Sequence, residues 1–135
     1  MGASLPEKTL ERIADGAVDR ELERVLPHEQ VGWLDEARFG ARRVPAEAGG
    51  PGDSIEDLVG EVVRLSRADS NVAHLYRGHF AFVESLRFQP EGVQEVWYPR
   101  VLAGRTVGNA STEKGGNALG SLNTVLDQDL SLIHI

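Results

Sequence analysis

Residues 107–121 read VGNASTEKGGNALGS, and this stretch decides how the rest of the chain is interpreted. A short run of strand-like residues passes into small and hydroxyl-bearing residues and then into a glycine-rich loop. Such a loop exposes backbone N–H groups and lets a flat or anionic ligand come close to the chain. The stretch lacks the Gly-x-x-x-x-Gly-Lys-Ser/Thr pattern of a nucleoside triphosphate site and the Gly-x-Gly-x-x-Gly pattern of a dinucleotide fold. Taken alone, it is more typical of a turn-rich surface loop than of a binding site.

The residues before this stretch are patterned for helices. Apolar residues recur there at intervals of three and four, as they do on the buried face of a helix. The predicted helices span residues 9–26, 29–39, 53–68, 71–86 and 91–103. In the first helix the expected buried stripe consists of Leu10, Ile13, Ala14, Ala17, Val18, Leu22 and Val25.

Local signals indicate where these helices begin and end. Gly40 is expected to cap the second helix. Asp53 and Glu56 have the spacing of a capping box at the start of the third helix. Asp69, or the residue after it, is expected to end the third helix and to cap the fourth. Pro99 lies inside the fifth helix and is expected to kink or end it.

Strand signals appear only after the last helix. Residues 105–112 are predicted to form a strand, and residues 122–126 are a weaker candidate for a second. A lone strand cannot satisfy its own backbone hydrogen-bonding groups. We therefore expect a mainly α chain, in which a helical domain at residues 1–104 is followed by the start of a β domain at residues 105–128. Residues 129–135, DLSLIHI, are predicted to be a non-native tail.

Composition excludes several classes of function. The chain has 135 residues, which suits one domain, and its net charge of −7 argues against nucleic acid or an anionic membrane as a partner. It has no cysteine, so disulfides and thiolate nucleophiles are excluded. No apolar run approaches the roughly 18 residues of a membrane span, and we expect a cytoplasmic protein. Four scattered histidines without an H-E-x-x-H motif predict no metal site.

Four short motifs follow one another along the chain: RVPAEAGG at residues 43–50, RADSN at residues 67–71, WYPRVLAG at residues 97–104, and the stretch at residues 107–121. In this order they resemble the acyl-CoA dehydrogenase superfamily. The first looks like that family's hydrophobic-Pro-x-x-x-Gly-Gly turn, the second like a boundary between two helices, and the last two like its flavin-binding segment. The resemblance covers residues 8–126.

This resemblance implies an acyl-CoA dehydrogenase-like fold, of which the chain would supply the N-terminal helical domain and the first strands of the middle β domain. The parent protein would be a flavin-dependent oxidoreductase, a homotetramer that binds FAD or FMN and a small-molecule substrate. The N-terminal piece by itself is expected to be inactive. The residues expected to bind the flavin are Asn109, Ser111, Thr112, Gly116, Gly120 and Ser121.

His79 is the predicted catalytic residue. The run HLYRGHF at residues 74–80 resembles the flavin-dependent monooxygenase branch of the superfamily, which includes dibenzothiophene monooxygenases and sulfur acquisition oxidoreductases. In that branch a histidine on this helix can lie near the reaction centre. His79 also falls in the apolar stripe of its helix, so the alternative is a core histidine that is satisfied by a hydrogen bond.

Two departures from the family pattern bear on the substrate. Lys114 stands where the family usually has proline after Thr-Glu, and the loop at residues 115–121 is longer than the family's Gly-x-Gly-Ser-Asp. The longer loop favours a monooxygenase that uses reduced flavin and O2. An acyl-CoA dehydrogenase that oxidises an acyl thioester, and a non-catalytic helical interaction module, remain as alternatives.

Overall fold

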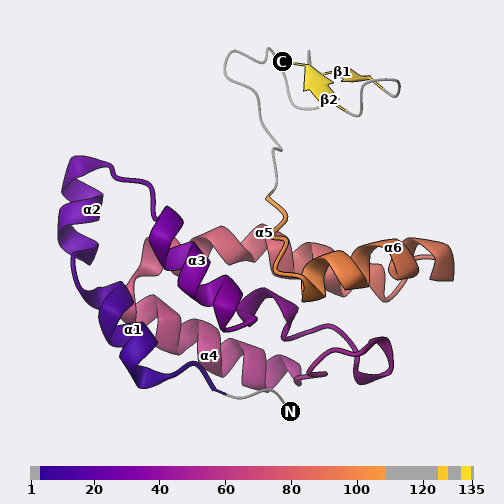
Figure 1. Ribbon diagram of the computed structural model, residues 1–135, viewed down its shortest axis with the longest axis horizontal. Coiled ribbons are helices and arrows are strands. Elements are labelled where there is room, and N and C mark those ends of the chain that lie inside the picture. The colour runs from indigo at the N-terminus through magenta and orange to yellow at the C-terminus, as the bar shows by residue number, and fades with distance from the viewer. Residues whose placement is uncertain (1–3, 109–124, 128–131, 135) are drawn as a thin grey trace.

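The computed structural model describes residues 4–108, 125–127 and 132–134 of the chain, and this part is mainly helical. Figure 1 shows the arrangement of its elements. The α-helices are α1 (Glu7–Ala14), α2 (Ala17–Glu23), α3 (His28–Glu36), α4 (Ile55–Ala68), α5 (Ser70–Leu86) and α6 (Glu91–Leu102). Two 3-10 helices, η1 (Phe39–Ala41) and η2 (Ala46–Ala48), lie in the connection between α3 and α4. The prediction of a mainly α chain is confirmed.

Helix α5 is the central element of the described structure. It folds back on α4, which in turn packs against α1 (Figure 1). The side chains of α5 join two hydrophobic cores. The first core contains Leu10, Ile13, Leu34, Phe39, Leu58, Leu65, Val72, Tyr76 and Phe80. The second contains Ala41, Val44, Val83, Leu86, Tyr98 and Val101.

The junction between α4 and α5 is the single residue Asp69, the first of the two positions that the sequence offers for it. Its backbone N–H bonds to the carbonyl of Leu65 at the end of α4, and its Oδ1 accepts from the N–H groups of Asn71 and Val72 at the start of α5. Such an acceptor satisfies N–H groups that have no partner within the helix. One residue therefore ends one helix and begins the next.

The capping box of α4 lies one residue later than predicted. Ser54 is the N-cap, and its hydroxyl accepts from the N–H of Asp57 while the Asp57 carboxylate accepts from the N–H of Ser54. Asp53, the predicted cap, is instead buried, with its carboxylate 2.6 Å from the guanidinium of Arg42. The N-cap is thus Ser54, and the Asp53 carboxylate pairs with Arg42.

The predicted first helix is wrong in its length, because it is two helices. Helix α1 ends at Ala14, and Gly16 adopts a left-handed conformation with φ of 70° before α2 begins. Glycine reaches this conformation at little steric cost, so it ends the first helix. Of the predicted stripe, Leu10 and Ile13 are buried, whereas Val18 and Leu22 on α2 are 70% and 76% exposed.

The ends of two other helices also differ from the prediction. Helix α3 stops at Glu36, because Arg38 is left-handed with φ of 54°, and Gly40 lies inside η1 instead of capping the helix. Helix α6 runs past Pro99 to Leu102, so the proline does not end it. A proline removes one backbone donor, and a helix can continue beyond it when its later turns are bonded.

The predicted strands are only partly within the described residues. Residues 105–108 form no strand, and residues 109–112 lie outside the description. A small antiparallel pair joins β1 (Val125–Asp127) to β2 (Leu132–His134), with Val125 opposite His134. Residues 122–124 and most of the predicted tail lie outside the described ranges, so the β-domain start and the non-native tail stay predictions.

None of the helices that the structure describes has the length and apolarity needed to span a bilayer.

Candidate functional site

Polar groups from separate parts of the chain lie together at the point where the chain continues beyond α6. Asp35 comes from α3, Tyr76 and His79 come from α5, and Thr106 and Val107 follow α6. We call this set the exit anchor, and its members are Asp35, Gly40, Tyr76, His79, Thr106 and Val107. It includes Val107, the first residue of the glycine-rich stretch at residues 107–121.

His79 is at the centre of the exit anchor and is completely buried. Its Nε2 lies 2.8 Å from the carbonyl oxygen of Gly40, and the N–H of Val107 donates to its Nδ1 over 3.1 Å. A backbone N–H can only donate, so Nδ1 must be the accepting nitrogen. Nε2 then carries the ring proton and donates it to Gly40. The imidazole is neutral, with both nitrogens bonded to backbone groups.

The residues that surround His79 in the fold explain why its ring fits. A Cβ at position 40 would lie 2.8 Å from Nε2, so the histidine needs glycine there. Tyr76 and Phe80 contact the ring edge-on, with centroid separations of 5.9 Å and 5.4 Å. The ring is thus held by the aromatic part of one core and by two distant segments of backbone.

Asp35 is the only acidic group that faces the imidazole among the described residues of the exit anchor. The hydroxyls of Tyr76 and Thr106 each lie 3.5 Å from its Oδ1, at the outer limit of a hydrogen bond. Burial raises the pKa of Asp35, although these hydroxyls and His79 oppose the shift. Burial also raises the pKa of Tyr76, and the Asp35 carboxylate adds to that effect.

The pKa of His79 is lowered, chiefly because burial disfavours the imidazolium. The bond to the Gly40 carbonyl and the charge of Asp35 oppose this shift. The environment therefore keeps the ring neutral. Proton uptake at Nδ1 would require the Val107 N–H to move away. In this arrangement both ring nitrogens are bonded to backbone groups, so neither is free to act as a base.

Of the residues predicted to carry chemistry, only His79 lies within the described residues. Its contacts match the alternative of a satisfied core histidine, and its assignment as a catalytic residue stays a prediction. The predicted flavin-binding residues Asn109, Ser111, Thr112, Gly116, Gly120 and Ser121 lie outside the described ranges. Their roles also stay predictions.

The RVPAEAGG motif forms a tight turn that is fixed by backbone geometry. Gly49 is left-handed with φ of 82°, and a Cβ on Gly50 would lie 2.2 Å from the carbonyl oxygen of Val44. Arg43 forms a bidentate ion pair with Glu84 on α5. The glycines therefore shape the turn, and the arginine attaches it to α5.

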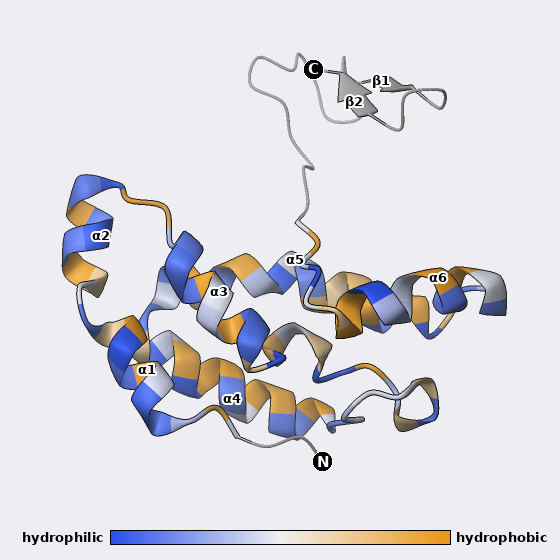
Figure 2. Ribbon diagram, viewed as in Figure 1, coloured by the Kyte–Doolittle hydropathy of each residue, from blue (hydrophilic) through white to orange (hydrophobic). Residues whose placement is uncertain are grey.

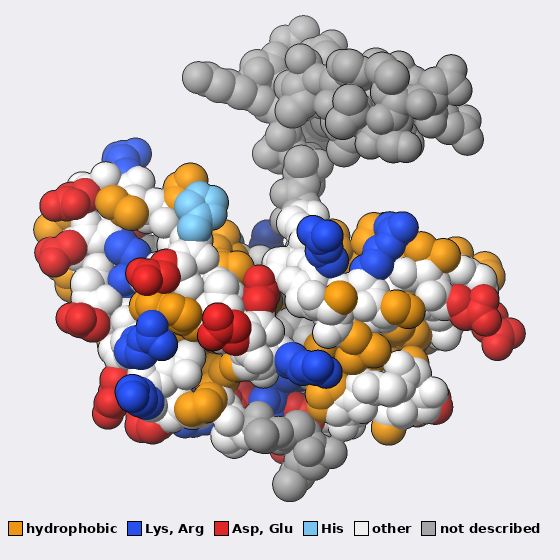
Figure 3. Space-filling view, viewed as in Figure 1, with side chains coloured by type: hydrophobic (Ala, Val, Ile, Leu, Met, Phe, Trp, Pro, Cys, Tyr) orange, Lys and Arg blue, Asp and Glu red, His pale blue; other side chains and the backbone are white. Residues whose placement is uncertain are grey.

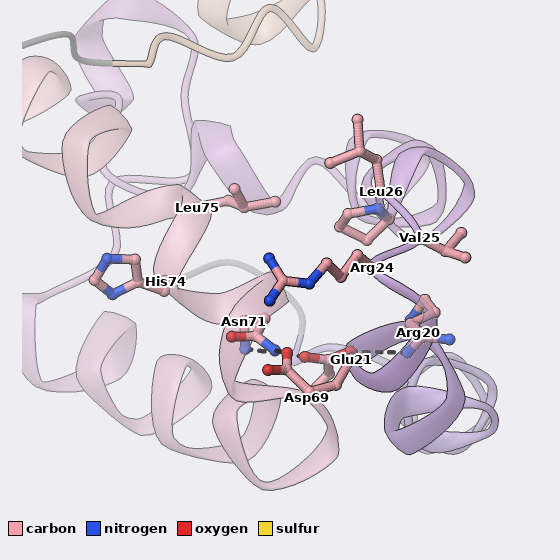
Figure 4. A pocket seen from close by; sticks show the side chains of 10 residues that line it. Arg20, Glu21, Arg24, Val25, Leu26, Asp69, Asn71, His74 and Leu75 are labelled. Carbon is pink, nitrogen blue, oxygen red and sulfur yellow. Dashed lines mark hydrogen bonds and ion pairs between the residues drawn. The ribbon is translucent and has the colours of Figure 1, made fainter. Parts of the chain in front are cut away.

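A cleft of 520 Å³ lies between α2 and α5 (Figure 4). Four of its polar side chains already bond to one another in two pairs: Arg20 lies 2.8 Å from Asp69, and the amide of Asn71 donates to Glu21. Arg24 extends between the two helices. The cleft includes neither His79 nor the segment after α6, so it is separate from the exit anchor.

Of the exit anchor, the sequence predicts a functional role only for His79. Asp35 and Thr106 are 71 positions apart, and nothing in the local pattern relates them. Gly40 has the sequence context of a helix cap, whereas its glycine is needed for the approach of His79. The spacing of Tyr76 and His79 on one helix face is the only available signal.

The part of the chain that the structure describes contains no group of acidic residues and histidines that could hold a metal ion. Comparison with protein-family models, with curated proteins and with solved structures found no match in any of the three.

Proposed function

We propose that the chain is the N-terminal part of a flavin-dependent oxidoreductase of the acyl-CoA dehydrogenase superfamily, in the branch of monooxygenases that use reduced flavin and O2. The observation that carries the proposal is the order of the four motifs along a chain that is helical up to Leu102. The mainly α fold agrees with the helical domain that the resemblance implies. The cytoplasm is the proposed location.

The exit anchor supports the proposal through its position. Thr106 lies against Asp35 of α3 and Val107 is bonded to His79 of α5, so the predicted flavin-binding stretch starts from a fixed point on the helices. Polar edges of a flavin need donors and acceptors that a rigid element places. An anchored start is what such a stretch requires.

The polar groups of the exit anchor are already bonded to one another and are not free to contact a flavin. The ring nitrogens of His79 are bonded to backbone, and the hydroxyls of Tyr76 and Thr106 face Asp35. The groups that would meet the isoalloxazine are the hydroxyls and backbone of Ser111 and Thr112. FAD or FMN would supply the redox chemistry, and the helices would hold the start of the flavin-binding stretch in place.

The test uses the protein encoded by the complete reading frame. We expect it to bind flavin and to consume oxygen when supplied with reduced flavin. Thr112→Val removes a predicted hydrogen bond and should weaken flavin binding roughly 3- to 10-fold, the value of one net hydrogen bond. Thr9→Val, on α1, is the matched control and should leave binding unchanged.

Three other results would change the proposal. Reduction of an electron acceptor with acyl-CoA, without oxygen uptake, would identify a dehydrogenase. Equal flavin affinities in the two threonine variants would remove Thr112 from the site. A protein with no flavin affinity and no flavin-stimulated oxygen uptake would contradict the proposal and favour the helical interaction module.

A further inference from the structure

His79 connects three segments that are far apart in the chain. It lies on α5, its Nε2 bonds to Gly40, which is 39 positions earlier, and its Nδ1 accepts from Val107, which is 28 positions later. Both bonds are made to backbone groups. The side chain therefore fixes the path of the chain at two places and does so only in one tautomer.

We propose that neutral His79 is a latch that holds residues 106–108 against the helices, and that protonation of Nδ1 releases them. Because residue 109 begins the predicted flavin-binding stretch, His79 would then be a positioning residue for that stretch. This second statement rests on the proposed function, whereas the latch itself does not.

Protonation opposes the latch for a geometric reason. An imidazolium carries hydrogen on both nitrogens, so the Nδ1–H would face the N–H of Val107 and the bond between them would be lost. The groups around the ring do little to stabilise the imidazolium in place of the lost hydrogen bond. Among the described residues, Asp35 on α3 is the one charged group that faces the ring. Tyr76 on α5 is neutral. The remaining neighbours are the Gly40 carbonyl of η1 and Thr106 after α6, and neither of them titrates.

The turn that precedes the latch is held separately. The N–H of Gly104 bonds to the carbonyl of Val101, and the N–H of Arg105 bonds to the carbonyl of Arg100. These bonds belong to the end of α6 and do not involve His79. Release should therefore be confined to the residues that follow Arg105.

Two substitutions separate the two bonds of His79. His79→Asn keeps an acceptor at the position of Nδ1 and loses the group at Nε2, whereas His79→Gln keeps a donor near Nε2 and loses the acceptor for Val107. Hydrogen exchange by NMR on the 135-residue chain reports the Val107 amide directly. We expect its protection factor to fall roughly 3- to 10-fold in His79→Gln, the range for one net hydrogen bond, and to be largely retained in His79→Asn.

Two further variants leave the histidine in place. Val107→Pro removes the N–H that donates to Nδ1, so proton uptake no longer breaks a bond and the pKa of His79 should rise. Asp35→Asn removes the facing negative charge, so the pKa of His79 should fall. Both shifts are measured from the ring resonances, and the Val107 amide of the wild type should titrate with the same midpoint as the ring.

The outcomes distinguish the latch from the proposed function. A Val107 protection factor that is unchanged in His79→Gln, or a His79 pKa that Val107→Pro does not raise, would overturn the latch. In the full-length protein, flavin affinity should be weaker for His79→Gln than for His79→Asn. Equal affinities would overturn the positioning role, and a wild type without flavin affinity would overturn the proposed function while the NMR result still decides the latch.

Discussion

Gly50 is the described glycine at which an added side chain would find least room. A Cβ there would lie 2.2 Å from the carbonyl oxygen of Val44 and 2.5 Å from its Cβ. The nearest obstacle is a backbone atom, which cannot rotate away. At Gly60, on the exposed side of α4, an added Cβ would meet nothing within 4 Å. The two glycines therefore have different reasons for being present.

This contrast predicts opposite effects of the same substitution. Gly50→Ala should lower the free energy of unfolding by about 1–3 kcal/mol, as overpacking does. Gly60→Ala should raise it by up to about 1 kcal/mol, because alanine is the better helix former. Urea unfolding followed by circular dichroism measures both. Similar values for the two variants would show that the turn at residues 43–52 can relax.

The junction of α4 and α5 depends on one side chain. Asp69 caps α5 with Oδ1 and pairs with Arg20 through Oδ2, which lies 2.8 Å from the guanidinium. The side chains of Asp69 and Arg20 are only 6% and 14% exposed. The same carboxylate thus joins α5 to α2, an element in which no residue is buried.

Two substitutions of Asp69 separate these roles. Asp69→Asn keeps a capping oxygen but leaves Arg20 without its carboxylate, which should cost about 3 kcal/mol of unfolding free energy. Asp69→Ala also removes the cap and should cost roughly 1 kcal/mol more. The exposed Asp19 is the control, and Asp19→Asn should change stability by less than about 0.5 kcal/mol. If Asp69→Asn behaved like Asp19→Asn, the ion pair would contribute nothing.

On the scale of the whole molecule, several helices present apolar side chains to solvent. Val18 and Leu22 on α2 are 70% and 76% exposed, and Ile55 and Val59 on α4 are 52% and 54% exposed. Figure 2 shows that α4 has hydrophobic residues along much of its length, and Figure 3 shows hydrophobic side chains on the half of the surface that contains α6. A helix that is apolar on several faces is normally covered on more than one side.

We therefore expect the 135-residue chain to associate as its concentration rises. Sedimentation velocity should show a sedimentation coefficient that increases with concentration. The double variant Leu22→Glu/Val59→Glu should suppress this increase while leaving secondary structure intact. Ser66→Glu/Gln89→Glu adds the same charge at exposed polar positions and should not suppress it. A wild type that sediments as a monomer throughout, or a control that behaves like the test variant, would contradict the expectation.

The sequence by itself determined the helical class, the bounds of α5 to within a residue, and the position of the junction between two helices to residue 69 or 70. These features depend on residues a few positions apart. Apolar spacing selects a helix face, and a carboxylate can reach the N–H groups two and three residues ahead of it. Nothing beyond one turn of chain was needed to predict them.

Only the tertiary structure decided the break at Gly16, the exposure of α2 and the composition of the exit anchor. Helical spacing identifies an apolar stripe, but whether another element covers it depends on the fold. Likewise, His79 is placed in an apolar stripe by sequence, whereas its partners Gly40 and Val107 are 39 and 28 positions away. The hydrogen-bond partners of a side chain depend on which segments the fold brings within about 3 Å of it. That distance cannot be predicted from the residues that are adjacent in the sequence.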